Sequence, residues 1–497
     1  MIRLCSLILF LLLVSPLHAA TLKIGVARGD ITPPKSVPLW GQFNLRLSQG
    51  VESPLMVNVV ALESADREKR LDSAIFVCLD LCIVTADLLH AVQEKVADKV
   101  SSIDVTKLVV NATHTHSAPT LSLDHPKLPV SDQIMDYPEA IDFTAERIAI
   151  AIAEAWQSRK PGKIAFGLDF GIVTWNRRAA YADGRSVMLG NTNQPDFRGM
   201  ESMEDHDIGS LFFMDEHEHV LAVAVNVASP SQIVGANIAV SPSFWQISAD
   251  FWHPVRQTLM KRFGKDLVVL GWCGAAGDNC PYPMYQRATI ERMNTLRELD
   301  EMQSIARTID RAVSETWDAV RTTATGEVTL AHRVETLQLP MRTVSEQEYQ
   351  SAKAECERIS AAVKANPDKA PAEIDWMAGG WHGKVVRHYE ALQNNPDSRY
   401  VAGIRVIQLG EMVIFTNPFE MFTDYGVQMK ARSPAVQTFV IQLVGDAPTS
   451  SYLATERAVQ GGGYSAVIQS APVSPEGGQI LVEETLKIAD GLFVKEL

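Results

Sequence analysis

The feature that most constrains this sequence is the alternation of short apolar runs, rich in β-forming residues, with helical runs. Six apolar runs read LDSAIFVCLDLCIV, TKLVVNAT, VLAVAVNVAS, DLVVLGWCG, MVIFTNP and QTFVIQLVG. Between several of them lie helical patterns such as ADLLHAVQEKVADKVSS and TAERIAIAIAEAWQSR. Strands that alternate with helices predict an α/β fold, with mixed β-sheets flanked by helices.

The chain reads as one large domain with a helical insertion. Its 497 residues would allow two or three domains or a single large one. The segments 285–320 and 345–365 are charged, helix-forming and poor in Gly and Pro, which predicts solvent-facing helices. The best candidate break, Asn366–Ala372, is too short for a domain linker. We therefore expect a single domain over residues 21–497, with a helical insertion at about 285–395.

The first twenty residues have the pattern of a secretory signal peptide. Arg3 is followed by an unbroken apolar run from Leu7 to Val14, then by Pro16 and the small residues Ala19 and Ala20. This pattern predicts export, to the periplasm or the exterior, with cleavage near Ala20; an uncleaved anchor is the alternative. The net charge of −14, without a basic tract, argues against a nucleic acid partner.

Five cysteines remain after such cleavage, and five is odd, so at least one thiol is free or pairs between chains. Cys78 and Cys82 lie in an apolar run and are interpreted as small buried hydrophobic residues. Cys273 and Cys280 flank a Gly-rich turn and are candidates for a disulfide in an oxidising compartment. The fifth is Cys356, and none of the spacings is that of a zinc ribbon.

Polar segments follow three of the apolar runs directly. These segments are Asn111-Ala-Thr-His-Thr-His-Ser-Ala-Pro, Gly274-Ala-Ala-Gly-Asp and Asn417-Pro-Phe-Glu. Ligands of open α/β sheets collect at the carboxyl ends of the strands. The three segments therefore predict one functional site.

His114 and His116 give the sharpest chemical signal. In an extended segment, residues i and i+2 point to the same side, so both imidazoles could bind one metal ion, or one could serve as a base. Two surface histidines are the alternative. Zinc needs three or four ligands, and Glu420, directly after an apolar run, is a candidate. A carboxylate that faces a helix dipole is the alternative for Glu420.

Together these motifs resemble the neutral (non-lysosomal, alkaline) ceramidases, a family of secreted or membrane-associated zinc amidases that cleave N-acylsphingosine. The most specific match is Asn111–Pro119. Further matches are Gly25-Val-Ala-Arg-Gly-Asp-Ile-Thr-Pro-Pro, Trp175-Asn-Arg-Arg, Ile247-Ser-Ala-Asp, Gly274-Ala-Ala-Gly-Asp-Asn, Ser451-Tyr-Leu-Ala-Thr-Glu-Arg and Gly463-Tyr. The resemblance covers about residues 22–490, the catalytic domain, and leaves no room for the family's C-terminal immunoglobulin-like domain.

The resemblance implies a role for each matching residue. His114, Glu420 and Tyr452 would bind Zn²⁺, and His116 would hold the attacking water as general base. Arg177 and Tyr464 would orient the amide and stabilise the oxyanion. Taken alone, Arg177 and the two tyrosines would not be selected, because Arg–Arg pairs are commonly solvated and tyrosines commonly pack.

One position departs from the family pattern. The family takes a second histidine ligand from an Asn-x-Ala-x-His segment, whereas Pro230 stands at that place in Asn226-Val-Ala-Ser-Pro-Ser-Gln. The candidates to replace the missing ligand are His253, His206 and Gln232.

We therefore expect an exported zinc-dependent amide hydrolase that acts on ceramide or a related N-acyl lipid. No Gly-x-Ser-x-Gly motif is present, which agrees with catalysis by activated water. The alternatives are a metal hydrolase with another substrate and a binding protein that has lost its metal. The sequence leaves peripheral membrane contact and the oligomeric state open.

Overall fold

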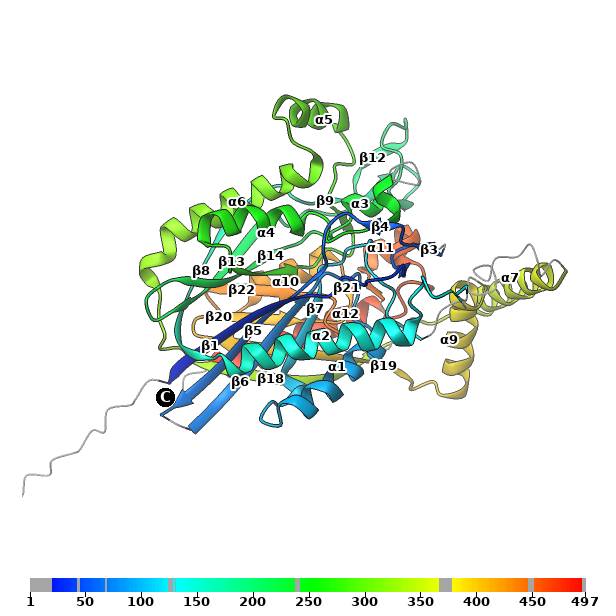
Figure 1. Ribbon diagram of the computed structural model, residues 1–497. Coiled ribbons are helices and arrows are strands. Elements are labelled where there is room, and N and C mark those ends of the chain that lie inside the picture. Colours follow the sequence, from blue (N-terminus) through cyan, green and yellow to red (C-terminus); the bar gives the residue numbers. More distant parts are fainter. Residues whose placement is uncertain are drawn as a thin grey trace, which may run out of the picture.

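The computed structural model describes residues 20–42, 45–67, 69–123, 128–129, 131–236, 242–365, 378–445 and 451–493. Two β-sheets pack face to face, and helices cover their outer faces (Figure 1). The α/β architecture expected from the sequence is confirmed. The predicted signal peptide and the segment Asn366–Ala372 lie outside the described residues.

The larger sheet has eight strands in the order β16-β14-β13-β8-β1-β5-β6-β7. Neighbouring strands are antiparallel except at the two ends, where β14 pairs with β16 and β6 pairs with β7 in parallel. The strands span Thr21–Asp30 (β1), Met56–Asp66 (β5), Lys69–Leu79 (β6), Leu108–Ala112 (β7), Lys160–Phe170 (β8), Asp207–Asp215 (β13), Val220–Val227 (β14) and Val268–Cys273 (β16).

The two ends of this sheet meet through side-chain hydrogen bonds. Asn111 Nδ2 of β7 donates to the carbonyl oxygen of Gly271 in β16 at 3.2 Å. Cys78 Sγ of β6 also contacts Gly271, accepting from its N–H and donating to its carbonyl, both at 3.2 Å. The loops that follow β7 and β16 therefore emerge side by side.

The smaller sheet has the order β18-β19-β20-β22, and β20 runs parallel to β22. Phe439 and Ile407 of this sheet pack against Phe76 and Trp272 of the larger one. β18 falls inside the stretch expected to be a helical insertion, so a strand divides the helices there. The strands span Leu330–Pro340 (β18), Arg399–Leu409 (β19), Met412–Thr416 (β20) and Gln437–Ile441 (β22).

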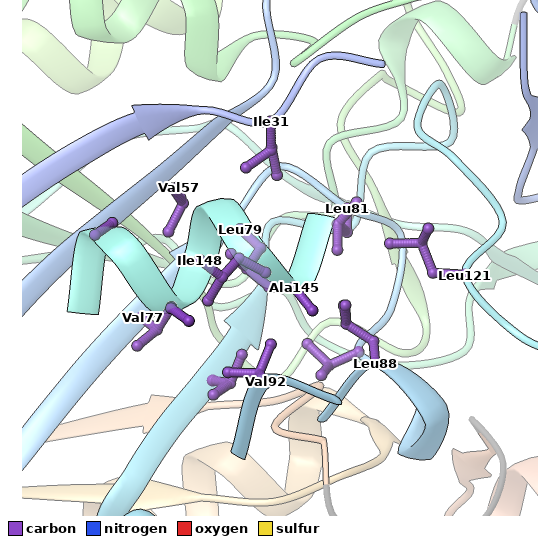
Figure 2. Close-up of a cluster of buried hydrophobic side chains, with 14 of the residues drawn as sticks. Ile31, Val57, Val77, Leu79, Leu81, Leu88, Val92, Leu121, Ala145 and Ile148 are labelled. Carbon is purple, nitrogen blue, oxygen red and sulfur yellow. The ribbon is translucent and has the colours of Figure 1, made fainter. Parts of the chain in front are cut away.

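Six helices cover the outer faces of the sheets. Leu88 and Val92 of α1 and Ile148 of α2 pack on Val77 and Leu79 of the larger sheet (Figure 2). α4 and α6 cover the other half of that sheet, and α10 and α12 cover the smaller sheet. These helices span Ala86–Lys99 (α1), Tyr137–Gln157 (α2), Trp252–Phe263 (α4), Glu301–Val320 (α6), Thr423–Arg432 (α10) and Pro475–Phe493 (α12).

The described part of the predicted insertion includes four α-helices, and their environments differ. α6 buries Ile305, Ile309 and Val313 in the core, so the expectation that this segment only faces solvent is wrong. α7 and α9 lie together at one side of the molecule, and α5 projects from another edge (Figure 1). The three span Arg287–Leu296 (α5), Glu346–Ala365 (α7) and Gly383–Asn394 (α9).

Short elements surround the ends of the long strands. They are β2 (Pro38–Leu39), β3 (Arg46–Leu47), β4 (Gly50–Val51), β9 (Trp175–Asn176), β10 (Arg178–Tyr181), β11 (Ser186–Met188), β12 (Phe197–Met200), α3 (Ile233–Ala236), β15 (Gln246–Ile247), β17 (Asn279–Cys280), β21 (Glu420–Met421), β23 (Tyr452–Leu453) and α11 (Glu456–Gly461).

Within the described chain, none of the five cysteines forms a disulfide. Cys273 Sγ hydrogen-bonds the carbonyl oxygen of Ser229 at 3.4 Å, and Cys280 Sγ hydrogen-bonds that of Tyr282 at 3.1 Å. The candidate disulfide between Cys273 and Cys280 is therefore wrong, because each thiol has its own carbonyl acceptor.

Candidate active site

The loop that carries the two histidines runs beside the loop that follows β6. The N–H of Thr113 donates to the carbonyl of Leu79, and the N–H groups of His114 and Thr115 donate to that of Leu81. His114 has a positive φ of 67°, so its segment is not extended as the sequence suggested. The imidazole rings nevertheless lie together, with centroids 5.0 Å apart at 77°.

His114 has one ring nitrogen bonded and the other facing a carboxylate. Nδ1 lies 2.7 Å from the carbonyl oxygen of Cys82, an acceptor, so Nδ1 carries the proton. Nε2 lies 3.3 Å from Glu420 Oε2, yet this buried nitrogen has no hydrogen-bond partner within the described chain. Burial opposes ionisation, but Cys82 and Glu420 outweigh it and raise the pKa of His114 well above its usual value. A cation, either a proton or a metal ion, is therefore favoured between the two groups.

Glu420 and Tyr452 are held opposite each other by a short parallel pair of strands, β21 and β23. The Tyr452 hydroxyl hydrogen-bonds the Glu420 carboxylate. Although burial opposes ionisation, His114 and Arg177 together with this hydrogen bond lower the pKa of Glu420. Burial, then the charge of Glu420, raises the pKa of Tyr452 well above its usual value. The pair therefore presents a carboxylate and a protonated phenol.

Arg177 closes another side of the site. Its Nη2 donates to the carbonyl of Gly277 at 2.9 Å and to the Tyr452 hydroxyl at 3.2 Å, and lies 3.9 Å from Glu420 Oε2. Its Nη1 donates to Gln232 Oε1 at 3.3 Å. The side chains of Arg177 and Arg178 are 3% and 0% exposed, so neither arginine is solvated as such pairs commonly are.

Gln232 connects Arg177 to His116. Because a guanidinium only donates, the amide oxygen of Gln232 faces Arg177 and its NH₂ group faces His116 Nε2, at 2.8 Å. His116 Nε2 is therefore the acceptor and carries no proton. Burial, followed by the charges of His114, Arg46 and Arg177, lowers the pKa of His116 well below its usual value. His116 is thus a neutral imidazole.

Tyr464 lies beside Tyr452. Its ring is 5.8 Å from that of Tyr452 at 76° and stacks on Trp381 at 5.6 Å and 9°. Burial, then the charge of Glu420, raises its pKa to about 12. Trp381 belongs to a short π-helix, Ala378–His382, within the insertion. The insertion therefore reaches the site, which sequence reasoning did not anticipate.

The Gly-rich loop after β16 fixes the positions of the other segments. Asp278 accepts hydrogen bonds from Thr423 N and Oγ1, each at 2.8 Å, and from Asn176 Nδ2 at 2.9 Å. The carbonyl of Asp278 accepts from the Arg177 N–H at 2.8 Å. One buried residue thus joins the segments before Arg177 and after Glu420.

Of the three candidates to replace the missing histidine, Gln232 alone has described contacts with the other site residues. His253 lies on α4, where its Nε2 is 2.9 Å from Gln257 Nε2. The described hydrogen bond of His206 is through its carbonyl, to Gly171. The side chain of Gln232 is already engaged by Arg177 and His116.

Sequence reasoning missed two further residues. Arg46 donates hydrogen bonds to the backbone carbonyls of Trp40, His116 and Phe244 and thereby holds the histidine loop in place. Cys82 Sγ lies 3.7 Å from His114 Nδ1. A prediction that β6 and β7 pair in parallel would have indicated Cys82. This pairing brings the loop after β6, which contains Cys82, next to the loop after β7, which contains His114.

The residues fit a zinc ion. Two ligands bound at about 2.0–2.1 Å to a tetrahedral ion lie about 3.3 Å apart. His114 Nε2 and Glu420 Oε2 have this separation, 3.3 Å, and the nitrogen lacks another partner within the described chain. Tyr452, beside Glu420, offers a third donor.

Comparisons with known proteins agree on the architecture. No protein family and no curated protein matches the chain by sequence. A solved neutral ceramidase from Pseudomonas aeruginosa is similar, with a TM-score of 0.63 and 15% identity over 96% of this chain and 76% of that one. A solved ceramidase complexed with C2 gives 0.62 and 14% over 95% and 75%. The chain has a ceramidase-like fold. At such identities, the likeness is to the fold alone.

Proposed function

We propose that this chain is an exported, zinc-dependent amide hydrolase that cleaves the N-acyl bond of ceramide or a related N-acyl lipid. The observation that carries the proposal is the separation of 3.3 Å between His114 Nε2, which lacks a hydrogen-bond partner within the described chain, and Glu420 Oε2, beside a neutral His116. The ceramidase-like fold supports the class of substrate. Export rests on the N-terminal sequence.

His114, Glu420 and Tyr452 would hold the zinc ion. When bound, zinc supplies Lewis acidity, which polarises a carbonyl and lowers the pKa of water to about 7. The burial of all three side chains keeps bulk water away from the donors, which strengthens their electrostatic interactions.

His116 would act as the general base. Its Nε2 carries no proton, so it can accept one from water and later pass it to the leaving amine. Water would take the place of the Gln232 amide as the hydrogen-bond partner of Nε2. No serine or cysteine nucleophile is required, so the reaction proceeds without a covalent enzyme intermediate.

Arg177 and Tyr464 would orient the amide and stabilise the oxyanion. Arg177 is fixed by the carbonyl of Gly277 and stays charged, because neighbouring Tyr452 and Glu420 outweigh the burial that lowers its pKa. Tyr464, with a pKa of about 12, keeps its proton at neutral pH and can donate. Preorganised donors of this kind are worth about 10²–10³ in rate each.

The substrate would be drawn from a membrane or micelle, because ceramide has two long chains. Within the part of the chain that the structure describes, no helix combines the length and the apolar character needed to cross a bilayer. We propose that contact with a lipid surface is peripheral.

The proposal is tested by the zinc content of the mature protein, measured by elemental analysis beside His114→Ala, with His253→Ala as a matched control. We expect about one zinc per chain in the parent and in His253→Ala, and none in His114→Ala. Fatty acid release from a short-chain ceramide should follow the zinc content.

Two other outcomes would redirect the proposal. Zinc binding without hydrolysis of any N-acyl lipid would favour a metal hydrolase with another substrate. No zinc in any variant, even after incubation with the ion, would contradict the proposed mechanism and favour a binding protein, the possibility that Pro230 raises.

A further inference from the structure

The donor set described above is short of one ligand. Pro230 stands where the resemblance expects a histidine, and Gln232 is engaged by Arg177 and His116. His114, Glu420 and Tyr452 remain, and Tyr452 is a protonated phenol. A buried zinc ion with these ligands would have only one nitrogen donor, His114, and no sulfur donor.

Cys82 lies close to both histidines and could offer such a donor. Its side chain is 2% exposed, and its Sγ and one ring nitrogen each of His114 and His116 all lie within 4.8 Å of one another. Within the described part of the chain, this is the one group of three or more His, Cys, Asp or Glu side chains with a metal-binding spacing. His114 Nε2 has no hydrogen-bond partner within the described chain and lies 3.3 Å from Glu420 Oε2, which is a second sign that a cation belongs here.

We propose that the Cys82 thiolate is a ligand of the metal ion that His114 anchors, and that it supplies the donor missing at Pro230. The inference rests on the proposed function, because it concerns the same ion. In a tetrahedral zinc site, with bonds of about 2.3 Å to sulfur and 2.0–2.1 Å to nitrogen, these donors are about 3.5 Å apart. Cys82 Sγ lies 3.7 Å from Nδ1 of the His114 ring, so joining an ion at Nε2 would require the thiol to move toward that side of the ring.

Binding of the metal ion by Cys82 requires loss of the thiol proton. The Cys82 S–H bond breaks, the metal–sulfur bond forms and the proton passes to solvent, with no change of oxidation state. The resulting thiolate and the Glu420 carboxylate together offset the two charges of the ion. A thiolate ligand also favours zinc over magnesium, calcium or manganese.

Substitution of zinc by cobalt(II) gives a direct test, since a cobalt–thiolate bond produces a near-ultraviolet charge-transfer band in addition to the visible bands of tetrahedral cobalt. The full-length mature protein, stripped with a chelator and titrated with Co²⁺, should show both sets of bands. Cys82→Ser should lose the charge-transfer band, keep the visible bands and bind zinc at least about tenfold more weakly. Cys273→Ser, which changes another buried and free cysteine, should match the parent.

The results separate this inference from the proposed function. Visible bands without a charge-transfer band in the parent, or an unchanged spectrum in Cys82→Ser, would overturn the sulfur ligand and leave the zinc hydrolase intact. Failure of the parent to bind either ion would overturn both. If Cys82→Ser does not fold, X-ray absorption on the zinc-loaded parent decides: we expect a sulfur scatterer at about 2.3 Å, and only nitrogen and oxygen would contradict it.

Discussion

Two neighbouring arginines show how adjacent residues take different tasks. Arg177 faces the candidate active site, where it contacts Gln232, Gly277 and Tyr452. Arg178 points the other way, with Nε and Nη2 on the carboxylate of Glu201 at 2.6 and 3.1 Å. Arg178 also donates to Ser465 Oγ at 3.0 Å, next to Tyr464. Arg177 therefore lies in the candidate active site, and Arg178 supports the loop that carries Tyr464.

We predict that Arg177→Lys mainly lowers the activity, whereas Arg178→Lys mainly lowers the stability. Lysine keeps the charge but cannot reproduce the forked hydrogen bonds. Arg177→Lys should lower kcat by about 10²–10³, as for loss of an oxyanion donor. It should destabilise the protein less than Arg178→Lys, because its hydrogen-bond acceptors are a carbonyl, a hydroxyl and an amide rather than a carboxylate. Arg178→Lys should reduce the free energy of unfolding by about 2 kcal/mol, because it loses hydrogen bonds to a buried carboxylate.

Urea unfolding and ceramide hydrolysis measured on both variants check this pair. The assignment of tasks is contradicted if Arg177→Lys retains full kcat, or if it destabilises the protein as much as Arg178→Lys does.

The sequence could identify some residues of the site and not others, for a physical reason. His114, His116 and Glu420 stand directly after apolar runs, so the positions of the strands alone indicate them. Gln232 and Trp381 come close only through tertiary packing, and no local pattern marks them.

At the scale of elements, the expectation that three loops share one edge rested on strand direction. β7, β16 and β20 each run parallel to a neighbour, and the loops after them carry His114, Gly277 and Glu420. The sequence could not predict that opposite ends of the eight-stranded sheet meet, because the Asn111 and Cys78 bonds to Gly271 are non-local. The strand β18 was missed because it lies between two helices.

Gly277 is the element-scale position most sensitive to substitution. A Cβ at Gly277 would lie 2.3 Å from the carbonyl oxygen of Glu420, a backbone atom that cannot move by rotation. Gly277→Ala should therefore push β21 away from the loop that follows β16 and shift the Glu420 carboxylate. We predict a loss of about 1–3 kcal/mol in stability, typical of overpacking, together with weaker zinc binding.

Gly491→Ala provides the control, since a Cβ there meets nothing within 4 Å and the residue lies in α12. This change should stabilise the protein by about 0.5–1 kcal/mol, as alanine does in a helix, without altering zinc affinity. Equal zinc affinity of Gly277→Ala and the parent would show that the loop does not position Glu420.

At the scale of the whole molecule, most buried charges have partners of opposite sign. Arg256 donates two hydrogen bonds to Asp80, at 2.6 and 2.7 Å, and Arg178 pairs with Glu201. Asp250 differs, because its described partners are the backbone N–H groups of Val234 and Phe251, each at 2.8 Å. Burial raises the pKa of Asp250, and the hydrogen bonds from the backbone lower it. The effect of burial is larger, so the pKa of Asp250 is about 7.

This raised pKa makes stability depend on pH in a definite direction. Below about pH 4 the carboxyl group is protonated in both states, and its favourable contribution is fully present. Between about pH 4 and 7 the unfolded chain loses the proton and the folded chain retains it, so the free energy of unfolding falls by about 1.4 kcal/mol per pH unit. Above about pH 7 both states are ionised and the loss is complete.

We predict that Asp250→Asn removes this dependence. Between pH 5 and 8, the free energy of unfolding of the parent should fall by about 2–3 kcal/mol relative to that of the variant. Other titrating groups cancel in this difference, including His332, whose pKa burial lowers to about 4. The amide loses one acceptor, which costs the variant a similar amount at every pH and leaves the difference in slope intact. Urea unfolding of both proteins at several pH values measures that slope, and parallel curves would mean that Asp250 ionises in the folded protein as readily as in the unfolded chain.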